Sequence, residues 1–353
     1  MRNLVVITFL PVLLCAQQPA EEQKPAVVAA VIKVENANGK DGDTANLKNK
    51  IYVSVANLEA WTDRPSNPEE IILFLDDRPL KTVTASVTGP PKDGVTRIAF
   101  DLMPDYSDPD EARNWRRLLV SARRAKDGRV ALSIGVAGKA PVGSGLRLKL
   151  NLERWYSKLI YLALVALAAG VVILARLTNL LRDGAPPLAP GQHPPYSLAR
   201  TQMAIWFLIV LAAWCYVSLM THSAAPLSDQ VLGLIGISGA TALAALAVDT
   251  GKWSKEIEER TALKKPEPVA PKSKGWLRDI LSDVNGVSLH RLQIFVWTVT
   301  LAIYFLWSTL RDLVMPEFDN QLLVLMGISS GTYLGFKWPE KVVSKEDAGG
   351  TAT

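Results

Sequence analysis

The chain has 353 residues, of which 49% are hydrophobic and 21% are charged, with a mean hydropathy of +0.15. This composition is too apolar for one soluble domain and too charged for a chain buried entirely in a membrane, so it indicates a mixed protein. The formal net charge of +5 is not gathered on one basic face, and two cysteines are too few for a disulfide scaffold or a cysteine-rich metal cluster.

The first 16 residues have the layout of a secretory signal peptide. A start containing Arg2 precedes an apolar run over 4–14 and the small residue Ala16, and we expect cleavage after Ala16. Lipidation of Cys15 is the alternative, which is disfavoured because Leu14 stands where lipidation signals have a small residue. The run is well short of the ~20 residues that a spanning helix needs, so residues 1–16 indicate export rather than an anchor.

Residues 25–153 are predicted to form an exported all-β domain. Leu148 and Leu150 alternate with Arg147 and Lys149, as expected for a strand with one buried face. About seven short strands in about 130 residues favour a β-sandwich of immunoglobulin-like type. The segment 112–124 fits either a strand or a short helix. The expected strands are 26–34, 51–55, 71–75, 83–87, 97–102, 130–136 and 146–152.

Five later stretches contain no Asp, Glu, Lys or Arg, and they predict an α-helical membrane domain of five spans. A spanning helix needs about 20 mostly apolar residues. The last stretch is shorter, so it must include flanking residues such as Lys337, whose aliphatic stem can reach the membrane surface. One such stretch would suit a buried helix of a soluble protein, but five in succession favour a membrane. The stretches are 159–175, 203–221, 231–248, 292–310 and 322–336, with the first span expected at 157–177.

The distribution of basic residues predicts the orientation of these spans. With residues 25–153 exported, the expected cytoplasmic loops and span ends hold 15 Lys and Arg residues, whereas the two short outer loops hold only Arg311. Cytoplasmic loops of membrane proteins are enriched in Lys and Arg. We therefore expect a multi-pass protein of the plasma (inner) membrane of a bacterial-type envelope. Its cytoplasmic parts are the loop 178–200, the linker 250–287 and the tail 341–353.

The membrane region contains an internal repeat with a constant offset of 91 residues. Residues 230–243 match 321–334 at eight of fourteen positions without a gap. Each unit begins on the expected cytoplasmic side, crosses outward and returns, so the sequence predicts two tandem helical hairpins of the same orientation, 197–249 and 288–340. Further upstream, Ser197, Leu198, Arg200, Gln202 and Trp206 match Ser288, Leu289, Arg291, Gln293 and Trp297.

Small residues recur in the second helix of each hairpin. Gly327, Gly331 and Gly335 are spaced four residues apart, and Gly236 begins a similar series in the first hairpin. Such a stripe lets helix backbones approach closely, so we expect packing within one subunit or between the subunits of a homo-oligomer. A hydroxyl-lined pore is the alternative. The packing or pore candidates are Gly236, Ser238, Thr241, Gly327, Ser329, Gly331, Thr332 and Gly335, with Glu317 and Asp319 as an acidic outer mouth.

Charged residues at the expected inner interface form a second candidate set. Arg200 and Arg291 lie near the start of the two hairpins, and Asp249 and Glu340, also 91 residues apart, lie at their ends. We hypothesise that each arginine pairs with an acid of this set; two independently solvated ends are the alternative.

The linker 250–287 is basic and interrupted by prolines. Trp276, Leu277, Ile280, Leu281 and Val284 follow at helical spacing, which predicts an amphipathic helix on the inner membrane surface. The cations of the linker would attract anionic lipid. We expect no nucleic-acid partner, because the loop lacks a folded surface for reading bases.

Two catalytic signatures occur in the predicted spans. Residues 327–331 satisfy G-x-S-x-G, which works only at a strained turn between a strand and a helix. Residues 236–239 resemble the G-x-S-G of rhomboid proteases, which implies an intramembrane serine and a histidine on another span. His193, His222 and His290 all lie outside the middle of the spans, so no base is available to activate the serine.

No phosphate-binding glycine loop, HExxH pair or CxxC pair occurs in the sequence, so we expect no catalytic residue, cofactor or metal. The sequence therefore predicts a non-enzymatic integral membrane protein. Its exported β-sandwich would bind a protein partner or another subunit, and its Gly/Ser-rich helices would oligomerise. The alternative is an oligomeric ion channel or pore.

Overall fold

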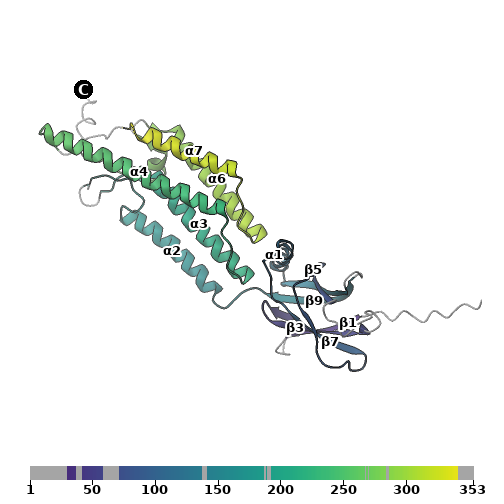
Figure 1. Cartoon of the computed structure of the whole chain (residues 1–353). Coiled ribbons are helices and arrows are strands. Elements are labelled where there is room, and N and C mark those ends of the chain that lie inside the picture. The colour runs from purple at the N-terminus through teal and green to yellow at the C-terminus, as the bar shows by residue number, and fades with distance from the viewer. Residues whose placement is uncertain are drawn as a thin grey trace, which may run out of the picture.

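The computed structural model describes residues 30–36, 42–58, 71–136, 141–186, 188, 192–266, 268, 270–283 and 286–340. A β-rich domain forms the amino-terminal part and a bundle of helices forms the carboxy-terminal part (Figure 1). The predicted signal peptide with Cys15, and the tail 341–353, lie outside the described residues.

The amino-terminal domain, called the β domain below, contains two sheets. All neighbouring strands are antiparallel except β2 and β9, which pair in parallel. The first sheet has the order β1 (Ala30–Asn36), β3 (Lys50–Ala56), β7 (Val95–Asp101) and β6 (Ala85–Val87). The second has the order β2 (Thr44–Asn46), β9 (Val142–Asn151), β8 (Arg129–Val136), β4 (Ile71–Leu75) and β5 (Arg78–Leu80).

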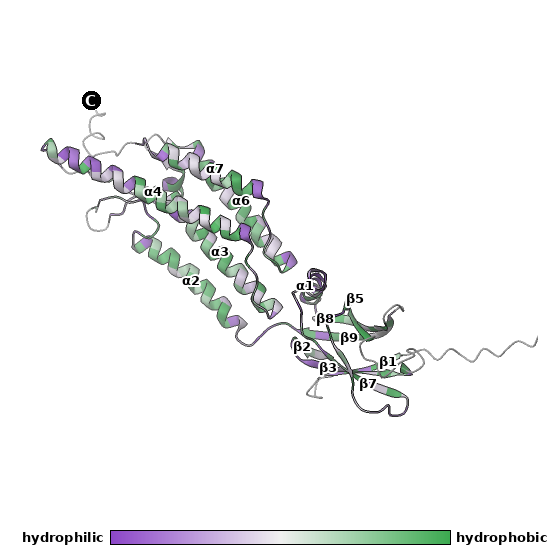
Figure 2. Cartoon of the chain, in the orientation of Figure 1, coloured by the Kyte–Doolittle hydropathy of each residue, from purple (hydrophilic) through white to green (hydrophobic). Residues whose placement is uncertain are grey.

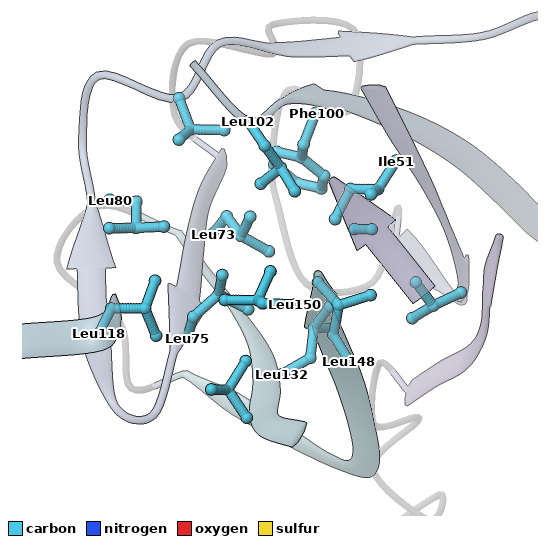
Figure 3. Packing of buried hydrophobic residues seen from close by; sticks show 14 of the residues in the cluster. Ile51, Leu73, Leu75, Leu80, Phe100, Leu102, Leu118, Leu132, Leu148 and Leu150 are labelled. Atoms are coloured by element: carbon cyan, nitrogen blue, oxygen red, sulfur yellow. The ribbon is translucent and has the colours of Figure 1, made fainter. Parts of the chain in front are cut away.

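One apolar core holds the two sheets together. Alternate residues of β4 are buried, as the period of two in a strand requires. Figure 3 shows Leu73 and Leu75 of one sheet and Ile51 and Phe100 of the other in one core, and these residues belong to the same buried cluster. Burying a side chain of this size contributes about 1.5–3 kcal/mol to stability. The β domain is therefore held by apolar packing.

The undecided segment 112–124 is helical and belongs to α1 (Pro109–Arg124). The Asp108 carboxylate caps the helix by accepting hydrogen bonds from the backbone N–H groups of Asp110 and Glu111, at 2.8 and 2.9 Å. Trp115, together with Leu118 and Leu119, places its side chain in the core of the domain. The spacing of these three residues at i, i+3 and i+4 gives the helix one apolar face.

Within the described part of the chain, four helices are long and apolar enough to cross a membrane. The fifth expected span, 322–336, falls in a helix of 18 residues, α7, which is not among those four. Figure 2 shows apolar residues along most of the bundle and hydrophilic residues near the end of α4. The four are α2 (Ser157–Leu177), α3 (Leu198–Thr221), α4 (Asp229–Ala262) and α6 (Leu289–Asp312); α7 covers Asn320–Lys337.

The linker forms less helix than its spacing predicts. Helix α5 covers only Trp276–Leu281, and Val284 lies outside the described residues. A two-residue hairpin follows, formed by β10 (Ser282–Asp283) and β11 (Gly286–Val287). Ile280 is fully buried in a cluster with residues of α3 and α6. The apolar side of α5 therefore packs on the bundle.

The two hairpins have the same helix boundaries. Helices α3 and α6 begin 91 positions apart and end 91 positions apart, and the starts of α4 and α7 differ by the same number. His222 and Leu313 follow α3 and α6 in the left-handed conformation, with φ of 55° and 51°. The hairpins differ at their ends, because α4 has 34 residues and α7 has 18.

The β domain is docked on the ends of α3 and α6. Met220 and Leu313 are buried in the same cluster as the core of the β domain. The Tyr106 hydroxyl donates to the Thr221 carbonyl at 3.0 Å. Helix α1 lies between the sheets and the helix ends (Figure 1). These contacts fix the orientation of the β domain relative to the bundle.

His222 is buried in this interface. Its Nε2 lies 3.2 Å from the Leu152 carbonyl oxygen, whereas its Nδ1 has no hydrogen-bond partner among the described residues. Burial lowers the pKa of His222, and Arg154 and Lys48 lower it further against the opposing effect of the hydrogen bond to Leu152. The folded chain therefore holds a neutral imidazole, since a proton on Nδ1 would add a buried donor without an acceptor.

The interface should weaken in mild acid because of His222. A histidine whose pKa is lowered on folding contributes stability that is full above about pH 6.5 and is lost as the pH falls and the unfolded chain takes up a proton. His222→Asn, which tolerates the left-handed conformation, should show a smaller drop in melting temperature between pH 7.5 and 5.5 than the parent chain in detergent. His193→Asn, at the other end of the bundle, is the control; identical pH slopes for all three chains would contradict this role of His222.

Candidate functional site: a buried ion-pair cluster

The buried ammonium of Lys337 lies between two carboxylates at the end of the bundle that is distant from the β domain. Its Nζ lies 3.0 Å from Asp183 Oδ1 and 2.9 Å from Asp249 Oδ2. The side chains are 2%, 20% and 11% exposed for Lys337, Asp183 and Asp249, respectively. The three residues come from the end of α7, the loop after α2 and helix α4.

The Lys337 ammonium has no donor left for a ligand. It also donates to the Tyr333 hydroxyl at 3.3 Å, and an ammonium carries three hydrogens. Burial by itself raises the pKa of Asp183, but Lys337 and the nearby Arg291 hold it below its ordinary value, so Asp183 is ionised. The geometry is that of a structural ion pair.

A second ion pair lies beside the first. Arg291 Nη2 lies 3.2 Å from Glu340 Oε2, and the guanidinium is 5.6 Å from the centre of the Tyr333 ring. Lys252 Nζ donates to the backbone carbonyl of Lys337, which satisfies an acceptor at the end of α7. The Tyr333 ring therefore lies next to the side chains of Arg291 and Lys337.

The loop that carries Asp183 is fixed by its own hydrogen bonds. The backbone N–H of Asp183 donates to the Pro195 carbonyl at 2.9 Å. The buried Arg182 donates to the Pro194 carbonyl at 2.8 Å and stacks on the ring of Tyr196, 4.1 Å from its centre. The carboxylate of Asp183 is therefore positioned by contacts of its loop in addition to the ion pair with Lys337.

A cavity of about 530 Å³ opens next to the cluster. Basic and acidic side chains are almost balanced in its walls, so it does not select strongly for an anion or a cation. Its charged lining residues are Lys252, Lys272, Lys274, Arg278, Arg291 and Lys337 on the basic side, and Asp183, Asp249, Asp279, Asp283 and Glu340 on the acidic side.

The structure brings together part of the predicted charge set. Arg291 is paired with Glu340, as the hypothesis requires. Asp249 is instead paired with Lys337, and Arg200 donates to the backbone carbonyl of Asn179 at 3.2 Å. Within the described residues, Arg200 forms no ion pair with an acid of this set, and Lys337 is instead the partner of Asp249, the acid at the end of the same hairpin.

Lys337 and Asp183 were missed as partners by the sequence reasoning. Two sequence signals point to them. Asp183 is the single acidic residue of the loop 178–200, and Lys337 is the first charged residue after the last apolar stretch. Charged residues that directly follow a spanning helix lie close to the hydrocarbon region, where an unpaired charge is costly. An acidic and a basic residue at such positions are therefore candidates for an ion pair with each other.

The predicted glycines face away from the neighbouring helices. A Cβ atom added at Gly236, Gly327, Gly331 or Gly335 would meet nothing within 4 Å. A shallow groove of about 590 Å³ between α4 and α7 includes Gly335. Packing inside one chain therefore does not use this stripe of small residues.

The predicted hydroxyl residues and outer acids do not converge on one lumen. Ser238 and Thr241 are buried and donate to carbonyls of their own helix at 2.9 and 2.7 Å. Ser329 is buried and its hydroxyl has no partner among the described residues. Thr332 is exposed, as are Glu317 and Asp319, and Asp319 caps α7 by accepting from the N–H of Gln321 at 3.0 Å.

Comparison of the chain with protein families, with curated proteins and with solved structures finds no match.

Replacing Lys337 alone should destabilise the bundle strongly. Lys337→Met removes the ion-pair partner of two buried carboxylates, and breaking a buried ion pair in this way costs about 3–5 kcal/mol. Adding Asp183→Asn and Asp249→Asn should recover much of that loss, because the buried charges are then removed together. The free energy of unfolding by SDS in mixed micelles measures both changes. The control is Lys265→Met, an exposed position, which should change stability by at most about 0.5 kcal/mol; a neutral Lys337→Met would contradict the role of the cluster.

Proposed function

We propose that this chain is a non-enzymatic integral membrane protein. In this proposal it anchors an exported immunoglobulin-like β-sandwich at the membrane and assembles into a homo-oligomer through α4 and α7. The observation that carries the assembly is the open space at the glycines of these two helices. The docking of the β domain on α3 and α6 supports the anchoring.

The strand order supports the immunoglobulin-like assignment. The order β1-β3-β7-β6 corresponds to A-B-E-D of that fold. The order β9-β8-β4 corresponds to G-F-C, with β2 and β5 added at the two edges. In place of the inter-sheet disulfide of antibody domains, the core contains Trp115 from α1.

The length and direction of α7 support a fifth span. Helix α6 runs from the ion-pair cluster to the β domain, and α7 returns to the cluster, where it ends at Lys337. Its 18 residues extend about 27 Å at 1.5 Å per residue, close to the ~30 Å hydrocarbon core of a bilayer. The constant offset of 91 positions between the starts and ends of α3 and α6, and between the starts of α4 and α7, supports the duplication of one hairpin.

The orientation follows from the positive-inside bias and from the signal-like residues 1–16. The ion-pair cluster and the basic residues after α4 then lie on the cytoplasmic side of the plasma (inner) membrane. The cations of this side would contact anionic lipid. The outward β domain would bind a protein partner or a second subunit.

Two helices in lipid can associate through faces that carry small residues, because their backbones then approach closely. Lipid offers no hydrophobic drive between helices, so close van der Waals contact along the stripe must supply the attraction. The faces of α4 and α7 that carry Gly236 and Gly331 are exposed in the single chain, and a second copy would cover both. The hydroxyls of Ser238 and Thr241 already donate to carbonyls of their own helix, which favours this assembly over a hydroxyl-lined pore.

Large side chains in place of the exposed glycines of α7 should separate the subunits. Gly331→Leu with Gly335→Leu should reduce the particle from an oligomer to the mass of a single chain, because the added side chains keep the facing helices apart. Native mass spectrometry in detergent measures the mass. Gly170→Leu on α2, where a Cβ also meets nothing, is the matched control and should keep the oligomer. A parent chain that is monomeric, or equal dissociation by the control, would overturn the assembly.

The orientation predicts which cysteines react from outside. In a background without Cys15 and Cys215, Lys126→Cys in the β domain should react with a membrane-impermeant maleimide in intact spheroplasts. Lys255→Cys, on α4 beyond the cluster, should react only after permeabilisation. The opposite labelling pattern would show that the orientation is inverted.

A further inference from the structure

A second cavity, of about 960 Å³, lies between the β domain and the end of α6. We name it the arginine pocket, because six arginines line it and Asp312 is the one carboxylate in its lining. The arginines come from three elements: Arg78 from β5, Arg113, Arg116, Arg117 and Arg124 from α1, and Arg311 from the last turn of α6. Cationic side chains from separate elements thus converge on one space.

Most of this charge is not neutralised within the described residues. Arg113 pairs with the exposed Asp110 at 3.3 Å, and Arg311 pairs with Asp312 at 2.8 Å. The other four arginines have no carboxylate partner within the described part of the chain. Arg78 Nη1 is buried and has no hydrogen-bond partner there. An unpaired buried guanidinium donor is costly, so the pocket favours an anion.

The amphipathic pattern of α1 directs the arginines to the pocket. Trp115 and Leu118 face the core, whereas Arg113, Arg116 and Arg117 recur at intervals of three and four residues on the pocket side. The Arg116 guanidinium is 5.9 Å from the centre of the ring of Tyr106, the residue whose hydroxyl bonds to the end of α3. The core packing of α1 therefore holds the charged side beside the bundle.

The position of the pocket relates it to the membrane. Arg311 stacks on Trp307, 4.4 Å from its ring centre, and Trp307 is 54% exposed. Ile303 and Leu310 are also exposed on the same helix. Tryptophan is enriched where a span meets the headgroup region. An apolar surface of α6 thus leads directly to the arginine pocket.

We propose that the arginine pocket binds the phosphate of an anionic phospholipid in the leaflet on the side of the β domain. Guanidinium groups bind phosphate oxygens bidentately, and the acyl chains would lie along the exposed apolar surface of α6. This site is separate from the basic linker at the other end of the bundle. The proposal rests on the membrane insertion stated under the proposed function.

Lipid titration followed by native mass spectrometry tests the pocket. The protein in detergent is titrated with phosphatidylglycerol, with phosphatidylcholine and with inorganic phosphate. We expect the first lipid to bind about tenfold or more tightly than the second, because both carry a phosphate but the choline cation of phosphatidylcholine cancels its net charge and is repelled by the arginines. The variant Arg116→Gln/Arg117→Gln/Arg124→Gln should lose this preference. Inorganic phosphate that binds as tightly as phosphatidylglycerol would assign the pocket to soluble phosphate compounds and overturn the lipid proposal.

Matched variants separate the pocket from other causes. Lys126→Gln/Arg147→Gln/Lys149→Gln removes the same charge from exposed positions of the β domain outside the pocket and should keep the lipid preference. Arg116→Lys/Arg117→Lys/Arg124→Lys keeps the charge and should restore part of the preference if the glutamine variant folds poorly. Equal binding by parent and glutamine variant overturns the proposal. Release of the protein from membranes by alkaline carbonate would instead contradict membrane insertion, so the two failures are distinguishable.

Discussion

The charge on Lys337 constrains the helical bundle more than any other single group. An ammonium buried at this depth costs several kcal/mol unless counter-charges and hydrogen-bond acceptors surround it. Asp183, Asp249 and Tyr333 supply them, and they come from the loop after α2, from α4 and from α7 itself. These segments must be in place together for any of them to be stable, so the cluster makes the folding of this end cooperative.

The opposite end of the bundle is stabilised mainly by apolar contacts with the β domain. There the β domain buries Met220 and Leu313 in its own core, and hydrogen bonds at Thr221 and His222 complete the contact. Apolar burial is strong in water and weak as a drive between helices in lipid. The contact with the β domain accordingly depends on apolar burial, whereas the contact at the other end of the bundle depends on ion pairs. In the first hairpin, α3 is thereby held at its end by the β domain, and α4 is held at Asp249 by the ion pair.

Local patterns predicted most of the elements, whereas contacts distant in sequence escaped prediction. The alternation at Leu148 and Leu150 located β9, and the uncharged stretches located four long apolar helices. The helical character of α1 was available from Asp108 and from the spacing after Trp115. The pair Lys337–Asp183 spans 154 positions and leaves no periodic signal. The pairing of Arg200 with an acid was predicted by analogy with Arg291, on the assumption that equivalent positions of the repeat have equivalent neighbours. The first hairpin, however, has Leu246 at the position equivalent to Lys337, so the two charge sets differ.

The length of α4 has a geometric consequence. The helix is held at Asp249 by the ion pair and continues for 13 residues to Ala262, about 20 Å at 1.5 Å per residue. On the other side of Asp249 it runs about 30 Å to its start at Asp229. Because the helix is continuous through the ion pair, its polar turns project about 20 Å beyond the level at which α7 ends at Lys337, and the rise of the helix sets that distance.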